Sequence, residues 1–298
     1  MARERALEVG VEPRPRAPGW LTGLRALLRI RLAAVGMAVI LIVAILAIFS
    51  KQIAPYDPSE QRAELARAAP SWSHLLGGDQ LGRDVLSRII YGSRVALGVG
   101  FGAVAFGVLA GVTIGLAGGY FRGVVDEVLM RAMDAIIAFP GLILALVVIS
   151  VLGNSSGTVI VALAVGTVPG TARIVRAQVL SLREQDYVTA ARALGAPATR
   201  IMGVHLLPNA FAPIIVIATV SMAFAILAEA ALGFLGVGVQ PPTPTWGSML
   251  RFSFPLLEIA PWLSIFPGAA IFILVLSWNF VGDALRDILD PRLRGVIR

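Results

Sequence analysis

The sequence predicts an all-α polytopic membrane protein with six transmembrane helices. Of its 298 residues, 57% are apolar and only 14% are charged, whereas about 25% of the residues in a soluble domain are charged. Six apolar segments reach or approach the roughly 20 residues that are needed to cross a bilayer core. The 31 glycines also suit helices that pack closely in lipid.

The apolar segments alternate with polar ones, and this alternation predicts the organisation of the chain. The spans are expected at residues 32–49, 95–121, 128–153, 158–172, 210–232 and 259–281. The expected parts are a cytoplasmic N-terminal tail (1–31), a first transmembrane helix (32–49), an extracytoplasmic segment (50–94), a five-helix transmembrane core (95–282) with a cytoplasmic loop (184–209) and a second extracytoplasmic segment (233–258), and a cytoplasmic C-terminal tail (283–298).

The first span follows a long basic region that contains seven arginines. A secretory signal peptide is the competing interpretation, but residues 1–31 are longer than the usual basic region of a signal. No clean A-x-A cleavage site follows the span. We therefore expect an uncleaved membrane anchor.

The second span is uncharged, and small residues recur at every fourth position along it. This spacing lets another helix approach closely. The partner helix belongs either to the same subunit or to a second subunit, and the spacing alone does not separate these alternatives. The small residues are Ala103, Gly107, Gly111, Gly115 and Gly119.

The later spans contain residues that disturb or polarise a helix. Pro140 lies inside the third span, and the fourth is expected to continue as a helix past Arg173. Glu229 lies near the outer end of the fifth span and is the obvious candidate for an ionisable residue within the membrane. Such a residue is either a helix-end carboxylate at the interface or part of a translocation path or outer gate. Gln240 and Trp246, in the following segment, are candidates for the same path.

The basic residues predict the orientation. With the N-terminus inside, 18 of the 25 lysines and arginines lie on the cytoplasmic side and 7 lie outside. This bias favours a multi-pass protein of the inner or plasma membrane with both termini in the cytoplasm. The net charge of +7 is then mainly a topology signal, and we expect no nucleic-acid partner.

The sequence lacks the residues that common active sites need. It has no cysteine, so it has no disulfide framework and no thiolate metal site. Lys51 is the only lysine and follows Phe49 and Ser50, so the chain has no GxxxxGK[ST] phosphate-binding loop. His74 and His205 are predicted on opposite sides of the membrane. We therefore expect no catalytic, cofactor or metal site in this chain.

The polar stretch between the fourth and fifth spans predicts two short helices on the cytoplasmic side. Asp186 at the start and Gly195 at the end suit the first of them. Pro197 is expected to begin the second helix, Pro208 to end it, and Asn209 to cap the fifth span.

One face of the first short helix is small and apolar, with Tyr187, Ala190, Ala191 and Leu194. A short exposed helix is marginal alone, but this face suits a groove on another protein. Burial of Tyr187 and Leu194 there would contribute a few kcal/mol at roughly 25 cal/mol per Å². A simple solvated connector is the alternative.

This stretch resembles the EAA loop of membrane subunits of ABC importers, whose pattern is EAA---G---------I-LP. The matching residues are Thr189-Ala190-Ala191, Gly195, and Leu207-Pro208. Thr189 stands where the pattern has Glu, and His205 with the following LLPN resembles the dipeptide, oligopeptide and nickel subfamily. The stretches 78–97 and 229–250 agree with that subfamily, and the resemblance covers about residues 30–290.

The resemblance implies a type I ABC importer permease fold and a C-type permease of a peptide importer. It implies four kinds of contact, namely a second related permease, two cytoplasmic ATP-binding subunits, an extracytoplasmic binding protein and membrane lipid. ATP hydrolysis is then expected in the partner subunits. The loop becomes the coupling loop that contacts the ATPases, with candidate residues Asp186, Tyr187, Thr189, Ala190, Ala191, Leu194, Gly195, His205 and Pro208.

Several alternatives stay open at this point. Within the resembling subfamily the substrate is a dipeptide, a longer peptide, a nickel chelate or another small solute. Outside it, an ion-coupled carrier would transport by this chain alone, and a membrane anchor or scaffold would transport nothing.

Overall fold

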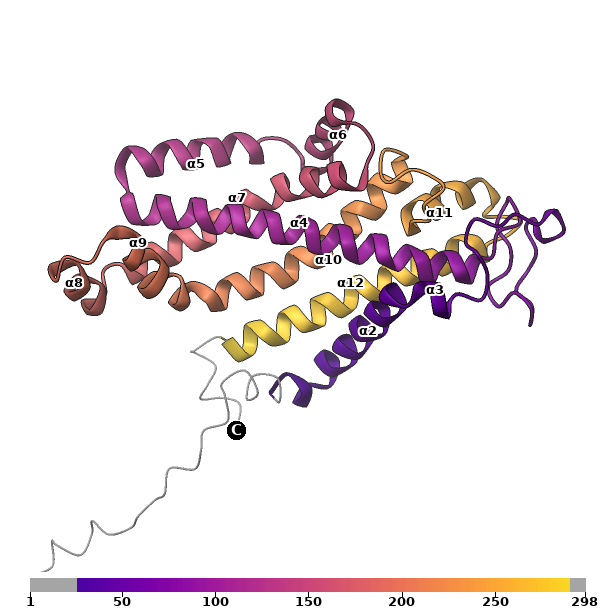
Figure 1. Cartoon of the computed structure of the whole chain (residues 1–298), viewed down its shortest axis with the longest axis horizontal. Helices are drawn as coiled ribbons and strands as arrows, with labels where there is room; N and C mark the ends of the chain where they lie inside the picture. The colour runs from indigo at the N-terminus through magenta and orange to yellow at the C-terminus, as the bar shows by residue number, and fades with distance from the viewer. Residues whose placement is uncertain (1–25, 290–298) are drawn as a thin grey trace, which may run out of the picture.

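The computed structural model describes residues 26–289, and within them the chain is a bundle of helices without a named strand (Figure 1). The all-α prediction is therefore confirmed. The expected tails lie largely outside the described residues, which exclude 1–25 and 290–298. The longer helices are α2 (Arg31–Ile48), α4 (Val85–Phe121), α5 (Gly123–Ile137), α6 (Gly141–Leu152), α7 (Ser156–Leu182), α10 (Phe211–Leu235) and α12 (Trp262–Leu289).

Short helices connect the long ones at both ends of the bundle. They are α3 (Ser50–Ile53), a 3₁₀ turn (Ala63–Leu65), α8 (Asp186–Ala193), α9 (Ala198–Arg200), a π turn (Ile201–Leu206), a 3₁₀ turn (Pro208–Ala210), α11 (Trp246–Ser253) and a 3₁₀ turn (Phe254–Leu256). Helices α8 and α9 lie at one end of the bundle, whereas α3 and α11 lie at the opposite end (Figure 1).

Within residues 26–289, five helices are long and apolar enough to cross a membrane, and a sixth span results if α5 and α6 count as one. The expected third span over 128–153 is not one continuous helix, because α5 and α6 meet at an angle of 91°. The break falls at Pro140, which precedes α6. Proline disfavours the helical conformation of the residue before it, so the helix does not continue through Phe139, and α5 ends at Ile137.

Helix α4 begins ten residues earlier than the expected second span. The Asp84 side chain caps it by accepting a hydrogen bond from the Ser87 amide at 2.8 Å. The helix has 37 residues and is therefore about 55 Å long at 1.5 Å per residue. This length exceeds a bilayer core of about 30 Å, so the charged first turns of α4 extend beyond the apolar layer.

The small residues of α4 pack against α7 of the same chain. A Cβ built at Gly107 would lie 2.7 Å from the Thr167 Cβ, and one built at Gly115 would lie 2.5 Å from the Ala172 carbonyl oxygen. Ala103, one turn before Gly107, is fully buried. The two backbones approach so closely that this face of α4 is covered within the subunit.

The two ends of the described chain lie on the same side of the bundle. Leu27 and Ala33, near the start of α2, form a buried cluster with Ala284 near the end of α12. Both helix ends point toward the end of the bundle that carries α8 and α9 (Figure 1). The chain therefore crosses the bundle an even number of times.

Candidate functional site

The candidate coupling loop consists of α8, α9 and the turns that follow them. Asp186 lies in the first turn of α8 and Arg192 in the last, where each charge complements the helix dipole. Gly195 has a φ of +76°. Its amide donates to the Arg192 carbonyl at 3.0 Å, and the Ala196 amide donates to the Ala191 carbonyl at 3.1 Å. The helix thus ends in a left-handed turn that glycine adopts without strain.

A small apolar cluster anchors the loop to the ends of the membrane helices. Val188, Ile201 and Leu206 are fully buried against Val175 and Val179 of α7. The loop is therefore held as a folded unit and does not hang freely from the bundle.

The opposite side of the loop is open. Leu194 is 88% exposed and Tyr187 is 41% exposed. Thr189, Ala190 and Pro208 are also exposed, whereas Ala191 and His205 are half-buried. The rings of Tyr187 and His205 lie 6.3 Å apart between centroids. A face of small and apolar side chains is thereby presented at the tip of the bundle.

The second half of the loop differs from the expectation. Pro197 precedes α9 and does not occupy its first turn, and Pro208 opens a 3₁₀ turn. Asn209 does not cap the fifth span, because its side-chain amide donates to the His205 carbonyl at 2.7 Å. That carbonyl lies at the end of a π turn, where a backbone acceptor needs a donor.

Arginines tie the loop to the end of α4. Arg183 donates to the Tyr120 carbonyl at 2.7 Å, and Arg122 donates to Glu184 at 2.8 Å. Partial burial lowers the pKa of the Arg183 guanidinium, and repulsion from Arg122 and Arg192 adds to this. These contacts hold the segment between α7 and α8 against the end of α4.

Two hollows lie along one side of α10 and share the lining residues Ile217 and Val220. The first has a volume of about 300 Å³ and is bounded by α6, α7 and α10. Gly166 and Gly170 of α7 line it, and a Cβ built on either would meet no atom within 4 Å. We call the two hollows together the α10 groove.

The second hollow is larger and more polar. It has a volume of about 680 Å³ and lies between α7, α10 and α12. Gln178, Asn209, Asp283 and Arg286 contribute polar side chains to it. Because Asn209 belongs to the coupling loop, the polar end of the groove adjoins that loop.

None of the three expected path residues lines the α10 groove. Glu229 is 1% exposed inside the bundle. Trp246 is buried and donates to the Ile89 carbonyl at 3.0 Å, which fixes the start of α11 against α4. Gln240 donates to the Gly236 and Gly238 carbonyls and so closes its own loop.

Two glycines of α7 that line the groove form a recognisable pattern in the sequence. Gly166 and Gly170 are spaced by four on α7, like the ladder on α4, but they face open space. Among residues 26–289, no three His, Asp or Glu side chains are grouped as a metal site.

Comparison with known proteins identifies the family. The family described as binding-protein-dependent transport system inner membrane component matches residues 104–295. The N-terminal TM domain of oligopeptide transport permease C matches residues 20–70.

Individual relatives match over nearly the whole chain. The dipeptide transport system permease protein DppC of Alkalihalophilus pseudofirmus is 41% identical over 92% of this chain and 90% of that protein. DppC of Escherichia coli is 47% identical over 88% of this chain and 89% of its own. The glutathione transport system permease protein GsiD of Pectobacterium atrosepticum is 41% identical over 92% of both chains.

A solved structure has the same fold at low sequence identity. A chain of the inward-facing MetNI methionine ABC transporter aligns with a TM-score of 0.54 and 21% identity, covering 68% of this chain and 96% of that one. This likeness shows the type I ABC transporter permease fold. Together with the match over residues 104–295, it shows that the chain belongs to the family of binding-protein-dependent transport system inner membrane components.

Proposed function

We propose that this chain is one of two related permeases in an ATP-driven importer of short peptides. The main support for this proposal is the α10 groove, whose polar end adjoins a folded and exposed coupling loop. Asn209 lies in the last turn of the loop and also lines the groove. A movement of the loop therefore acts directly on the passage.

The coupling loop is the proposed contact with cytoplasmic ATP-binding subunits. The face with Tyr187, Ala190 and Leu194 is exposed, and it offers apolar area that a partner groove would bury. ATP hydrolysis belongs to those partners, because this chain has no lysine in a phosphate-binding loop. Coupling-loop movement then opens the passage alternately to the two sides.

We propose that a second permease packs against the open side of the α10 groove. The groove is open along one side of this chain. Gly166 and Gly170 line it without neighbouring atoms beside them, so a helix of the second permease could approach α7 closely there. An extracytoplasmic binding protein delivers the substrate to the end that carries α11. Lipid covers α2, where Leu32, Val35 and Leu41 are exposed.

The peptide substrate is inferred from the relatives. Two of the relatives named above are called dipeptide permeases and one is called a glutathione permease. Short peptides are the class that these names share. A groove with an apolar wall and a polar end suits a ligand that carries both backbone amides and side chains.

Plugging of the groove tests the function. Gly170→Trp is expected to abolish most peptide uptake, because Gly170 lines the first hollow and a Cβ built there meets no atom within 4 Å, so that the indole would fill the hollow. Gly98→Trp is the matched control, since Gly98 is exposed on α4 and its built Cβ also meets no atom. Uptake of a labelled dipeptide is measured in vesicles with and without ATP.

Normal uptake by Gly170→Trp would contradict the proposed passage. Copurification of the second permease is measured on the same preparations, so that loss of assembly is recognised separately. Uptake by the isolated chain without ATP-binding subunits would instead favour the ion-coupled carrier.

The proposed orientation places both termini and the coupling loop in the cytoplasm. We expect the cysteine of Trp72→Cys to react with an impermeant maleimide from outside, and that of Val204→Cys, in the loop but not among the proposed ATPase contacts, to react only after the cell is opened. These side chains are 98% and 59% exposed, and the chain has no other cysteine. The reverse labelling pattern would overturn the orientation.

A further inference from the structure

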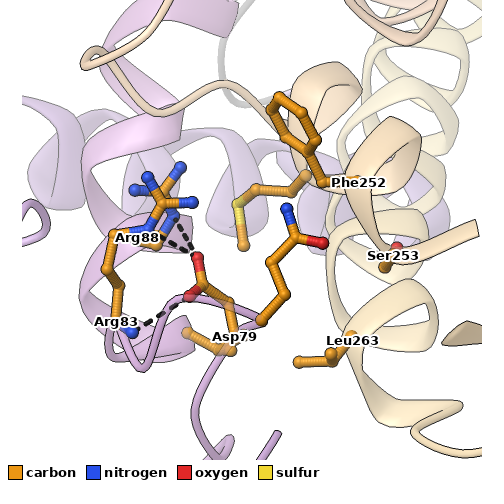
Figure 2. A pocket seen from close by; sticks show the side chains of 9 residues that line it. Asp79, Arg83, Arg88, Phe252, Ser253 and Leu263 are labelled. Carbon is orange, nitrogen blue, oxygen red and sulfur yellow. Dashed lines mark hydrogen bonds and ion pairs between the residues drawn. The ribbon is translucent and has the colours of Figure 1, made fainter. Parts of the chain in front are cut away.

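Three charged side chains surround a small cavity at the end of the bundle opposite the coupling loop. Figure 2 shows Asp79 between Arg83 and Arg88 on one side, with Phe252, Ser253 and Leu263 on the other. The charged residues come from the segment between α3 and α4 and from the first turn of α4. The facing residues belong to α11, where Phe252 and Ser253 lie, and to α12. The cavity therefore lies at a junction of three parts of the chain.

The charges that line the cavity do not balance. Arg83 donates to the Asp79 carboxylate at 2.7 Å, and the Arg88 Nε lies 3.5 Å from the same oxygen. Asp84 is the nearby carboxylate on this segment, but His74 and the Ser87 amide and hydroxyl already occupy its oxygens. Asp84 does not line the cavity. Two guanidinium groups thus share one lining carboxylate.

Arg88 has unused hydrogen-bonding capacity on its guanidinium. Arg88 is only 3% exposed, and one terminal nitrogen of its guanidinium donates to the Pro58 carbonyl at 2.9 Å. Among the described residues, its Nε has no hydrogen-bond acceptor. A buried charge without full compensation is costly, and a water molecule would supply an acceptor but no charge.

The size of the cavity restricts what fits in it. Its volume is about 20 Å³, close to the minimum of roughly 10–15 Å³ that holds one water molecule. A peptide, a phosphate or a sugar acid is therefore too large. Val85, Met249 and Leu263 form apolar walls, and an ion is stable against such walls only where a guanidinium compensates its charge.

We propose that this cavity binds a single monatomic anion, which is chloride in the cell. The anion accepts from Arg88 and neutralises the excess positive charge. It also links the segment before α4 to α11 and α12. This proposal does not depend on the peptide-import function, because the cavity lies apart from the α10 groove and shares no lining residue with it.

Anion-dependent melting of the intact transporter tests the proposal. The complex is purified through a tag on this chain, and its Tm is measured in chloride, bromide and gluconate at matched ionic strength. Chloride and bromide are expected to raise the Tm by about 2 °C or more over gluconate, since a ligand that binds only the folded state stabilises it. Gluconate is too large for the cavity.

Three variants separate site binding from a general salt effect. Arg88→Gln is expected to lose the chloride-dependent shift, whereas Asp79→Asn is expected to enlarge it because a competing negative charge is removed. Arg62→Gln is the matched control and should keep the wild-type shift, because Arg62 is a half-exposed arginine paired with Glu60 away from the cavity.

Equal Tm values in chloride and gluconate for the wild-type complex would overturn the proposal. A chloride shift that persists in Arg88→Gln, or one that shrinks in Asp79→Asn, would do the same. If Arg88→Gln does not yield a folded complex, the wild-type comparison and Asp79→Asn still decide the question.

Discussion

Gly195→Val is expected to abolish ATP-coupled uptake while the chain still inserts into the membrane. Gly195 has a φ of +76°, and a β-branched residue is strained there by about 1–2 kcal/mol. A Cβ at this position meets no atom within 4 Å, so the cost arises from the backbone alone. The eight-residue helix α8 is marginal by itself, and this strain is large enough to displace its end.

Gly203→Val is the matched control for this experiment. Gly203 lies in the same loop, is exposed, and has no neighbour within 4 Å of its built Cβ. It does not have a positive φ. Ala191→Arg is expected to behave like Gly195→Val, because it adds bulk and charge beside the exposed face of α8.

Copurification of the ATP-binding subunits and peptide uptake are measured for each variant. Loss of both in Gly195→Val and Ala191→Arg, with both retained in Gly203→Val, is the expected pattern. Normal copurification and uptake for the first two variants would make the loop a simple connector.

Gly111→Leu is expected to destabilise the chain and to reduce the yield of assembled transporter. A Cβ at Gly111 would lie 2.6 Å from the Thr171 Cβ and 2.8 Å from the Val168 carbonyl oxygen. Overpacking typically costs about 1–3 kcal/mol. The effect here is at the upper end, because a rigid backbone of α7 would have to move.

Gly98→Leu on the same helix is the matched control, since the Cβ at Gly98 meets no atom within 4 Å. The Tm of the purified complex and its yield from membranes are compared for the two variants. An equal and small effect of both would mean that the contact between α4 and α7 is not needed for stability.

The sequence alone determined the fold class, the family and the approximate places of the spans. Apolar runs of about 20 residues are strong signals because the bilayer leaves few ways to satisfy backbone groups. The stretch from Thr189 to Pro208 led to a family that the comparisons confirm. In the same stretch, the sequence predicts that Gly195 ends a short helix, and Gly195 has a φ of +76°. This prediction needs only local information, because glycine commonly ends helices in the left-handed conformation.

Which side chains meet depends on contacts between distant parts of the chain, and local sequence patterns do not reveal them. The ladder spacing on α4 was compatible with two partners, and the contacts place α7 against it. The apolar run around Pro140 does not predict the 91° bend between α5 and α6, because hydropathy does not report the angle between two helices. Glu229 and Trp246 are buried inside the bundle and do not line the groove, since burial depends on residues far away in sequence. The Arg88 cavity likewise arises where α11 and α12 meet a segment more than 150 residues earlier in the chain, a juxtaposition that no local pattern encodes.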